Sequence, residues 1–187
     1  MSGMTSVSPR KIFGGWNDSG LPAGERHIGQ TSPEFTVISA TVITNTAATY
    51  IDGKLAGTGG LVAFAGAARV AGGKGCVRSM MAVDRGDQAP CFNLILFNTT
   101  TVSTTLTDNA AIAIDDADVS KIVGLIACST ADYVDLGASK VVWKANQDVY
   151  FDLPSTATTL YAAVRAGATW TPTGVSDLGI QLQIEQF

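Results

Sequence analysis

The chain has 187 residues, of which 46% are apolar and only 15% charged, and its formal net charge is −4. This length predicts one domain with a sizeable core, and so few charged residues argue against a highly charged disordered protein. The acidic balance, with no basic run longer than Arg10-Lys11, also argues against a surface that binds nucleic acid.

The sequence shows neither the pattern of a membrane-spanning helix nor that of a secretory signal. No apolar run is long enough for a membrane-spanning helix, and the first fifteen residues lack the apolar segment of a secretory signal. We therefore expect no membrane partner, no nucleic-acid partner, and folding in a cytosol.

Residues 1–34 predict an irregular N-terminal arm. They contain three prolines and several glycines, and their apolar residues repeat with neither a strand period nor a helix period. The arm nevertheless holds Ile12, Phe13 and Trp16, which a merely disordered tail would not need. We expect these three side chains to contact a neighbouring protein surface.

Residues 35–187 predict a single all-β domain, because short segments rich in β-branched residues alternate with Gly, Asn, Asp and Pro. About eight strands without βαβ alternation favour a β-sandwich or a jelly-roll-like fold. The expected strand segments are residues 35–45, 55–64, 76–84, 91–97, 122–128, 140–143 with 149–153, 160–166 and 178–185.

Three segments carry more specific predictions. Residues 91–97 are almost continuously apolar, which predicts a strand buried on both faces. Residues 178–185 alternate apolar and polar, which predicts one packed face and one wet face. A short helix is expected at residues 115–121, capped by Asp115 or Asp116.

Catalytic groups are scarce in this sequence. The single histidine, His27, lies in the arm, and a general base would need an orienting carboxylate and a nucleophile beside it. Cys76, Cys91 and Cys128 stand in apolar surroundings without metal-ligand spacing, so we expect them to be buried, unpaired thiols. The sequence therefore predicts a protein that is not an enzyme and that needs no cofactor.

The densest polar feature is acidic and comprises Asp108, Asp115, Asp116 and Asp118. Oxygen-rich clusters can hold Ca²⁺, but the spacing does not match an EF-hand loop. Helix capping and turn formation explain the same residues, so we predict these roles and no metal.

Exposed aromatic rings on a β-sandwich could stack on sugars. We expect Trp143 and Tyr161 to lie in the core because they fall within strand patterns, whereas Trp170 lies in a Pro/Gly-flanked loop where it could be exposed. The other candidates are Tyr50, Tyr133 and Tyr150.

The centre of the chain resembles small structural proteins of tailed-bacteriophage virions. The resemblance lies in residues 93–97 (NLILF), 107–118 (TDNAAIAIDDAD) and 122–124 (IVG), and extends loosely to residues 61–73 and 158–163. It implies a head decoration, or cement, protein that binds the major capsid protein on the outer capsid surface, as a homotrimer assembled in the host cytoplasm. The arm is outside this resemblance.

Three alternative functions remain open. A tail-fibre or baseplate module would bind a host glycan or receptor, and another virion component, such as a tail-tube or neck protein, would form rings or tubes. An enzyme is the least favoured of the three, because the needed side chains are absent.

Overall fold

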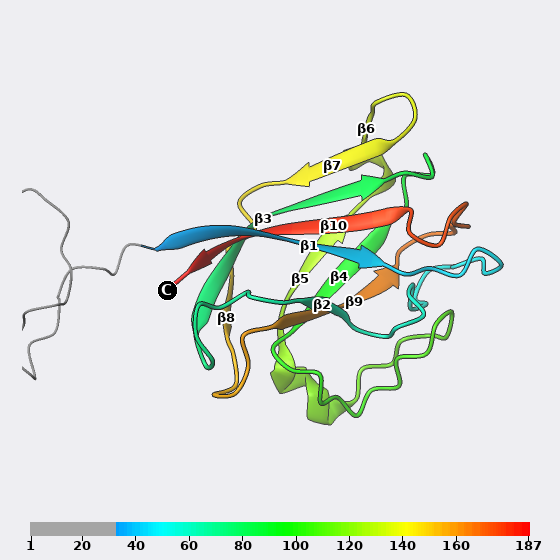
Figure 1. Ribbon diagram of the computed structural model, residues 1–187. Helices are drawn as coiled ribbons and strands as arrows, with labels where there is room; N and C mark the ends of the chain where they lie inside the picture. Colours follow the sequence, from blue (N-terminus) through cyan, green and yellow to red (C-terminus); the bar gives the residue numbers. More distant parts are fainter. Residues whose placement is uncertain (1–32) are drawn as a thin grey trace, which may run out of the picture. The chain divides into compact units, whose positions relative to one another are not determined.

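The computed structural model describes residues 33–187, which form an all-β, sandwich-like domain of two antiparallel sheets (Figure 1). The larger sheet has the order β1-β10-β3-β7-β6, with β8 also paired to β3, and the smaller sheet has the order β2-β9-β4-β5. The strands are β1 (Glu34–Val42), β2 (Val62–Phe64), β3 (Lys74–Asp84), β4 (Phe92–Phe97), β5 (Ile122–Cys128), β6 (Val134–Asp135), β7 (Lys140–Lys144), β8 (Val149–Asp152), β9 (Leu160–Ala166) and β10 (Leu178–Gln186).

The main core lies between the two sheets. The alternation predicted for the last strand places Leu178, Ile180, Leu182 and Ile184 of β10 in this core, where all four are fully buried. The expectation that the opposite face is wet is wrong, because its residues are buried or half-buried between the side chains of β1 and β3. From the smaller sheet, β4 contributes Phe92, Leu94 and Leu96, and β9 contributes the side chains of Leu160, Ala162, Val164 and Ala166.

A second apolar cluster covers β4 and β9 on the outer face of the smaller sheet, whereas Leu125 of β5 stays exposed on this face. Ile95 and Phe97 of β4 point into it, together with Leu55 and Ala163, and side chains from residues 102–114 pack on top. The prediction that β4 is buried on both faces is therefore confirmed, because one face meets the other sheet and the opposite face meets the chain's own long loop.

Most of the expected strands are confirmed, and ten form where about eight were expected. The segment predicted at residues 55–64 is shorter than expected, because Lys54 and Leu55 make only isolated bridges, to Ala111 and Arg165, and the regular strand begins at Val62. β6 was not predicted, since two residues leave no readable alternation. The helix expected at residues 115–121 is a 3₁₀ helix, η1 (Asp116–Lys121), with Asp115 as its cap.

Candidate functional site

The outer face of the larger sheet carries exposed apolar side chains. Six large apolar side chains on it, or just beyond its strands, have exposed fractions between 53% and 62%. They are Phe35, Val37, Val134, Trp143, Tyr150 and Phe187. We call this surface the bare face, because no segment of residues 33–187 covers it as residues 102–114 cover β4 and β9 of the smaller sheet.

Strand register brings these side chains together from distant parts of the sequence. One row across β1, β10, β3 and β8 joins Phe35, Glu185, Cys76 and Tyr150. A second row joins Ser39, Gln181 and Met81 to Trp143 of β7. The bare face thus combines apolar side chains with uncharged amides and hydroxyls.

The charged groups of the bare face neutralise one another. The Arg78 Nε donates to Oε2 of Glu185 at 2.5 Å, and its Nη1 donates to Asp148. The guanidinium also lies 5.9 Å from the centre of the Tyr150 ring, which stacks against Phe187 with 6.4 Å between ring centres. The hydrogen bond to Asp148 is the main cause that raises the pKa of Arg78, and the bond to Glu185 raises it further, so the guanidinium stays positively charged.

The expectation for Trp143 is wrong. Trp143 was expected in the core but is 58% exposed, because β7 turns this residue away from the smaller sheet. Trp170, whose loop could have left it exposed, is only 4% exposed, because residues 50 and 170 form a bridge and the two rings lie 5.4 Å apart. Tyr161 is half-buried and packs against the second apolar cluster.

One sequence signal points to part of the bare face. The first strand, FTVISATV, places Phe35 and Val37 on the face opposite Ile38 and Val42. Large apolar residues on both faces of an edge strand indicate a second contact beyond the core. The arm residues Ile12, Phe13 and Trp16, and also His27, lie outside the described residues.

The acidic cluster is divided among separate structural tasks. Asp108 accepts from the Tyr50 hydroxyl at 2.8 Å and from the N–H of Gly57 at 3.0 Å. Asp115 accepts from the N–H of Ala117 at 2.9 Å as the cap of η1, so the predicted capping role is confirmed there. Asp116 is exposed.

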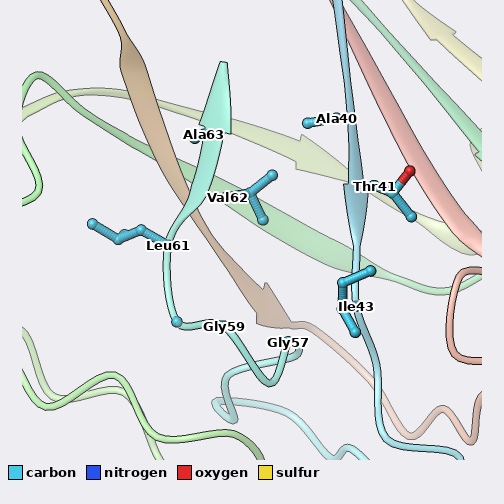
Figure 2. A pocket seen from close by; sticks show the side chains of 9 residues that line it. Ala40, Thr41, Ile43, Gly57, Gly59, Leu61, Val62 and Ala63 are labelled. Atoms are coloured by element: carbon cyan, nitrogen blue, oxygen red, sulfur yellow. The ribbon is translucent and has the colours of Figure 1, made fainter. Parts of the chain in front are cut away.

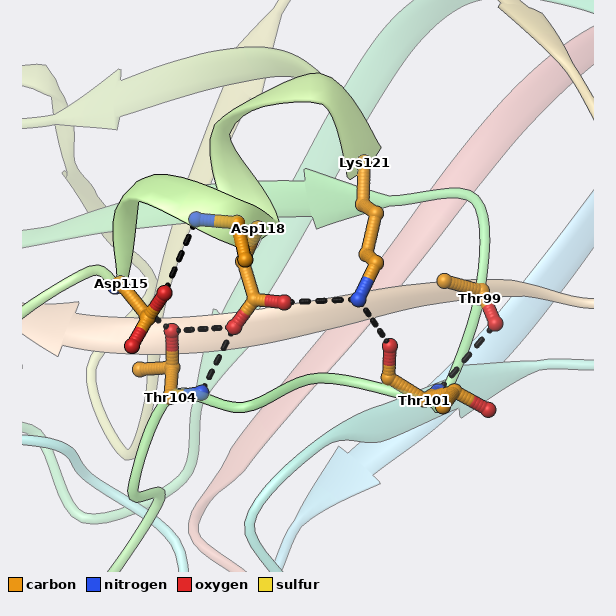
Figure 3. A network of polar contacts seen from close by, with 7 residues as sticks. Thr99, Thr101, Thr104, Asp115, Asp118 and Lys121 are labelled. Carbon is orange, nitrogen blue, oxygen red and sulfur yellow. Dashed lines mark hydrogen bonds and ion pairs between the residues drawn. The ribbon is translucent and has the colours of Figure 1, made fainter.

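Asp118 is fully buried and anchors the long loop over the smaller sheet (Figure 3). Its Oδ2 accepts from the N–H and hydroxyl of Thr104 at 2.6 and 2.7 Å, and its Oδ1 accepts from Nζ of Lys121 at 2.8 Å. The Lys121 bond is the main cause that holds the pKa of Asp118 well below its usual range, although burial acts in the opposite direction. Within residues 33–187 no three acidic, His or Cys side chains are grouped to hold a metal ion.

The three cysteines are free, as expected from their apolar surroundings. Cys76 and Cys128 are buried, whereas Cys91 is half-buried rather than fully enclosed. Burial raises the pKa of the Cys128 thiol to about 11 and also raises that of Cys76, so both remain protonated at neutral pH.

A groove of about 260 Å³ lies between the edge strands of the two sheets (Figure 2). One wall is Ala40, Thr41 and Ile43 at the end of β1, and the other is the uncharged stretch from Gly57 to Ala63. The residues that line the groove carry no titratable side chain.

Comparison of the chain with known proteins gives no match, either to a protein-family model or to a curated protein. In the described part of the chain, no helix has both the length and the apolar character needed to cross a membrane. The class established is therefore an all-β, sandwich-like domain with one bare outer face.

Proposed function

We propose that this chain is a non-enzymatic structural protein of a tailed-bacteriophage virion, which binds the outer surface of the head as a decoration, or cement, protein. The observation that carries the proposal is the bare face of the larger sheet, since the chain's own loop covers β4 and β9 of the smaller sheet. Large exposed apolar patches on a folded domain mark contact sites for other proteins. The sequence resemblance supplies the kind of partner, the major capsid protein.

The composition of the bare face supports a protein partner. Trp143 and Tyr150 are of the residue types enriched in protein interfaces, and long charged side chains are depleted there. The charges of Arg78, Glu185 and Asp148 already engage one another, so little unpaired charge would be buried on docking. A rigid sandwich with such a face would add one modest contact per copy, repeated over the capsid lattice.

The test of the bare face compares two variants with the same change on opposite sheets. Trp143→Glu places a charge in the proposed contact, whereas Leu125→Glu places it on β5 at a residue of similar exposure, 55% against 58%. Each purified chain is added to heads assembled without it, and the bound copies are counted. We expect Trp143→Glu to reduce occupancy at least about tenfold and Leu125→Glu to leave it unchanged. Equal occupancy for the two variants would contradict the proposal.

The arm makes a second contact in this proposal. Ile12, Phe13 and Trp16 would anchor residues 1–34 on a neighbouring subunit. Deletion of residues 1–30 should then lower incorporation into particles while leaving the unfolding temperature of the sandwich unchanged. Undiminished incorporation would remove the arm from the proposal and leave the bare face as the only contact.

A glycan-binding module is a second candidate, favoured by the exposed ring of Trp143. Trp170 cannot serve as the platform, because it is buried against Tyr50. On a glycan array, sugar binding that is lost in Trp143→Ala would support this candidate, and head binding without sugar binding would support the cement protein.

A further inference from the structure

A pocket of about 360 Å³ lies at the end of the sandwich where β10 finishes (Figure 1). This volume falls within the range of about 300–1,000 Å³ that is typical of small-molecule sites. Residues of β3 and β8 in the larger sheet form one wall, and Asn98 and Val123 from the smaller sheet form the other. The packing below is close, because a Cβ on Gly75 would lie 2.5 Å from the ring of Phe151.

Two exposed aromatic rings line this pocket. Tyr150 and Phe187 are stacked, with 17° between the ring planes and 6.4 Å between the ring centres. The Arg78 guanidinium lies over the Tyr150 ring, and the N–H of Phe187 donates to the carbonyl of Lys74 at 3.1 Å. The pocket therefore offers flat, apolar ring faces whose direction is fixed by their neighbours.

Three polar side chains line the same pocket. Nζ of Lys74 donates to Oδ2 of Asp152 at 2.6 Å, and Nδ2 of Asn98 donates to the carbonyl of Asp152 at 3.3 Å. Within residues 33–187 these are the only hydrogen bonds of the three side chains. Two N–H groups of Lys74 and the Oδ1 atoms of Asp152 and Asn98 are thus available to a ligand, as donors and acceptors respectively.

The lining narrows the chemical class of the ligand. Lys74 and Asp152 neutralise each other, which disfavours a phosphate or a metal ion. A wholly apolar ligand would take this ion pair out of water without replacing its hydrogen bonds. The carbonyls of Lys74 and Asp152 already accept hydrogen bonds, which disfavours an added β-strand. A pyranose ring matches both halves of the lining, because it has an apolar C–H face and hydroxyls that donate and accept.

We propose that this pocket binds a neutral saccharide. One pyranose ring stacks on the aromatic side formed by Tyr150 and Phe187, and its hydroxyls form hydrogen bonds with Lys74, Asn98 and Asp152. The inference does not rest on the proposed function, and it differs from the glycan module considered above, whose platform is the ring of Trp143. Where both the cement function and this site hold, the capsid contact leaves the Tyr150 end of the bare face open.

The test titrates the full, isotope-labelled chain with the methyl glycosides of glucose, galactose, mannose and N-acetylglucosamine, and follows the backbone amide resonances. The affinity per non-hydrogen atom that small ligands reach gives a dissociation constant on the order of 1 mM. We expect at least one glycoside to cause saturable shifts centred on Gly75, Val123 and Asp152. No saturable shift with any of the four, or shifts centred elsewhere, would overturn the proposal.

Three variants locate the stacking ring. Tyr150→Ala should weaken the binding of that glycoside about tenfold or more, whereas Tyr150→Phe keeps the ring and should retain the affinity. Trp143→Ala removes a ring of similar exposure, 58% against 62%, from the same sheet but outside the pocket, so it should leave the affinity unchanged. Equal losses in Tyr150→Ala and Trp143→Ala would overturn the proposal. Circular dichroism confirms that each variant is folded.

Two more probes test the ligand class. Methyl glucuronide adds a carboxylate to the sugar, and benzyl alcohol has an apolar ring without the sugar hydroxyls. Both should bind more weakly than the best methyl glycoside, because the pocket has no unpaired cationic side chain and its polar groups require several hydroxyls. Tighter binding of either probe would overturn the assignment to a neutral saccharide.

Discussion

Single polar side chains attach the long loops to the sandwich, and Tyr50 shows how. Its buried hydroxyl accepts from the N–H of Asn45 at 3.0 Å and donates to Asp108, which in turn holds Gly57. The loop of residues 45–57 is therefore tied to the distant Asp108 through one hydroxyl and one carboxylate oxygen. Burial is the main cause that raises the pKa of Tyr50 to about 12.

Replacement of Tyr50 by Phe should lower the free energy of unfolding by about 1–2 kcal/mol, because the partners of the hydroxyl lose buried hydrogen bonds. The exposed hydroxyl of Tyr150 provides the control, since Tyr150→Phe should leave the free energy of unfolding unchanged. Urea denaturation of both variants measures the difference. Equal effects of the two changes would contradict the role given to Tyr50.

The pH dependence of Tyr50 follows from its raised pKa. The unfolded chain loses the phenolic proton near pH 10, whereas the folded chain retains it to about pH 12, so the folded state binds more protons in this range. Its contribution to stability is complete below pH 10 and is lost as the pH rises toward 12. The difference between wild type and Tyr50→Phe should therefore shrink across this window, and a constant difference would contradict the shift.

Asp118 should make the stability of the fold depend on pH in the acid range. Because the pKa of Asp118 is lowered in the folded chain, its contribution is present above the ordinary carboxyl pKa of about 3.9 and is lost as the pH falls below it. Asp118→Asn should lower the unfolding temperature at pH 7, and its deficit should narrow in acid. Asp116 is an exposed neighbour, so Asp116→Asn should change neither the unfolding temperature nor its dependence on pH. Thermal unfolding of both variants from neutral to acid pH makes the comparison.

At the scale of elements, the contact between β5 and β8 closes one side of the sandwich. Gly124 is required there because any side chain would meet Val149. Gly124→Ala should cost about 1–3 kcal/mol of the free energy of unfolding through overpacking. Val149→Ala removes the methyl groups that the new Cβ would meet, so the double variant should be more stable than the sum of the two single losses predicts. Additive losses in a double-mutant cycle would contradict this contact.

The strands were predictable where one face is packed and the other is not. β10 follows this rule on its core side only, because its other face is buried or half-buried rather than wet. The buried run of β4 indicates two covers, even though it does not identify the loop that provides the second. The expected ends of most strands are close to the observed ones because Gly, Pro and Asp interrupt the alternation there.

Pairing between distant segments explains what sequence patterns could not predict. Trp143 is exposed and Trp170 is buried, because strand neighbours 60 to 120 residues away decide which ring is covered. The bare face required the registers of five strands, so its rows of side chains could not be assembled from the sequence. Two of its residues, Phe35 and Val37, could be identified in the sequence as apolar residues on the strand face opposite the core.

At the scale of the whole molecule, the bare face is one surface on which the low charge content of the sequence is found. The larger sheet presents apolar, amide and hydroxyl groups over its bare face, with its few charges paired. The chain's own loop covers β4 and β9 of the smaller sheet. The bare face is thus the surface on which the proposed contact with another protein depends.

The most direct test of the cement function is electron cryo-microscopy of heads to which the chain has been added. The proposal predicts density for the sandwich at regular positions on the outer surface, with the bare face turned toward the capsid shell and the loop-covered sheet toward solvent. Heads without added density, or sandwiches bound with the bare face exposed to solvent, would contradict it.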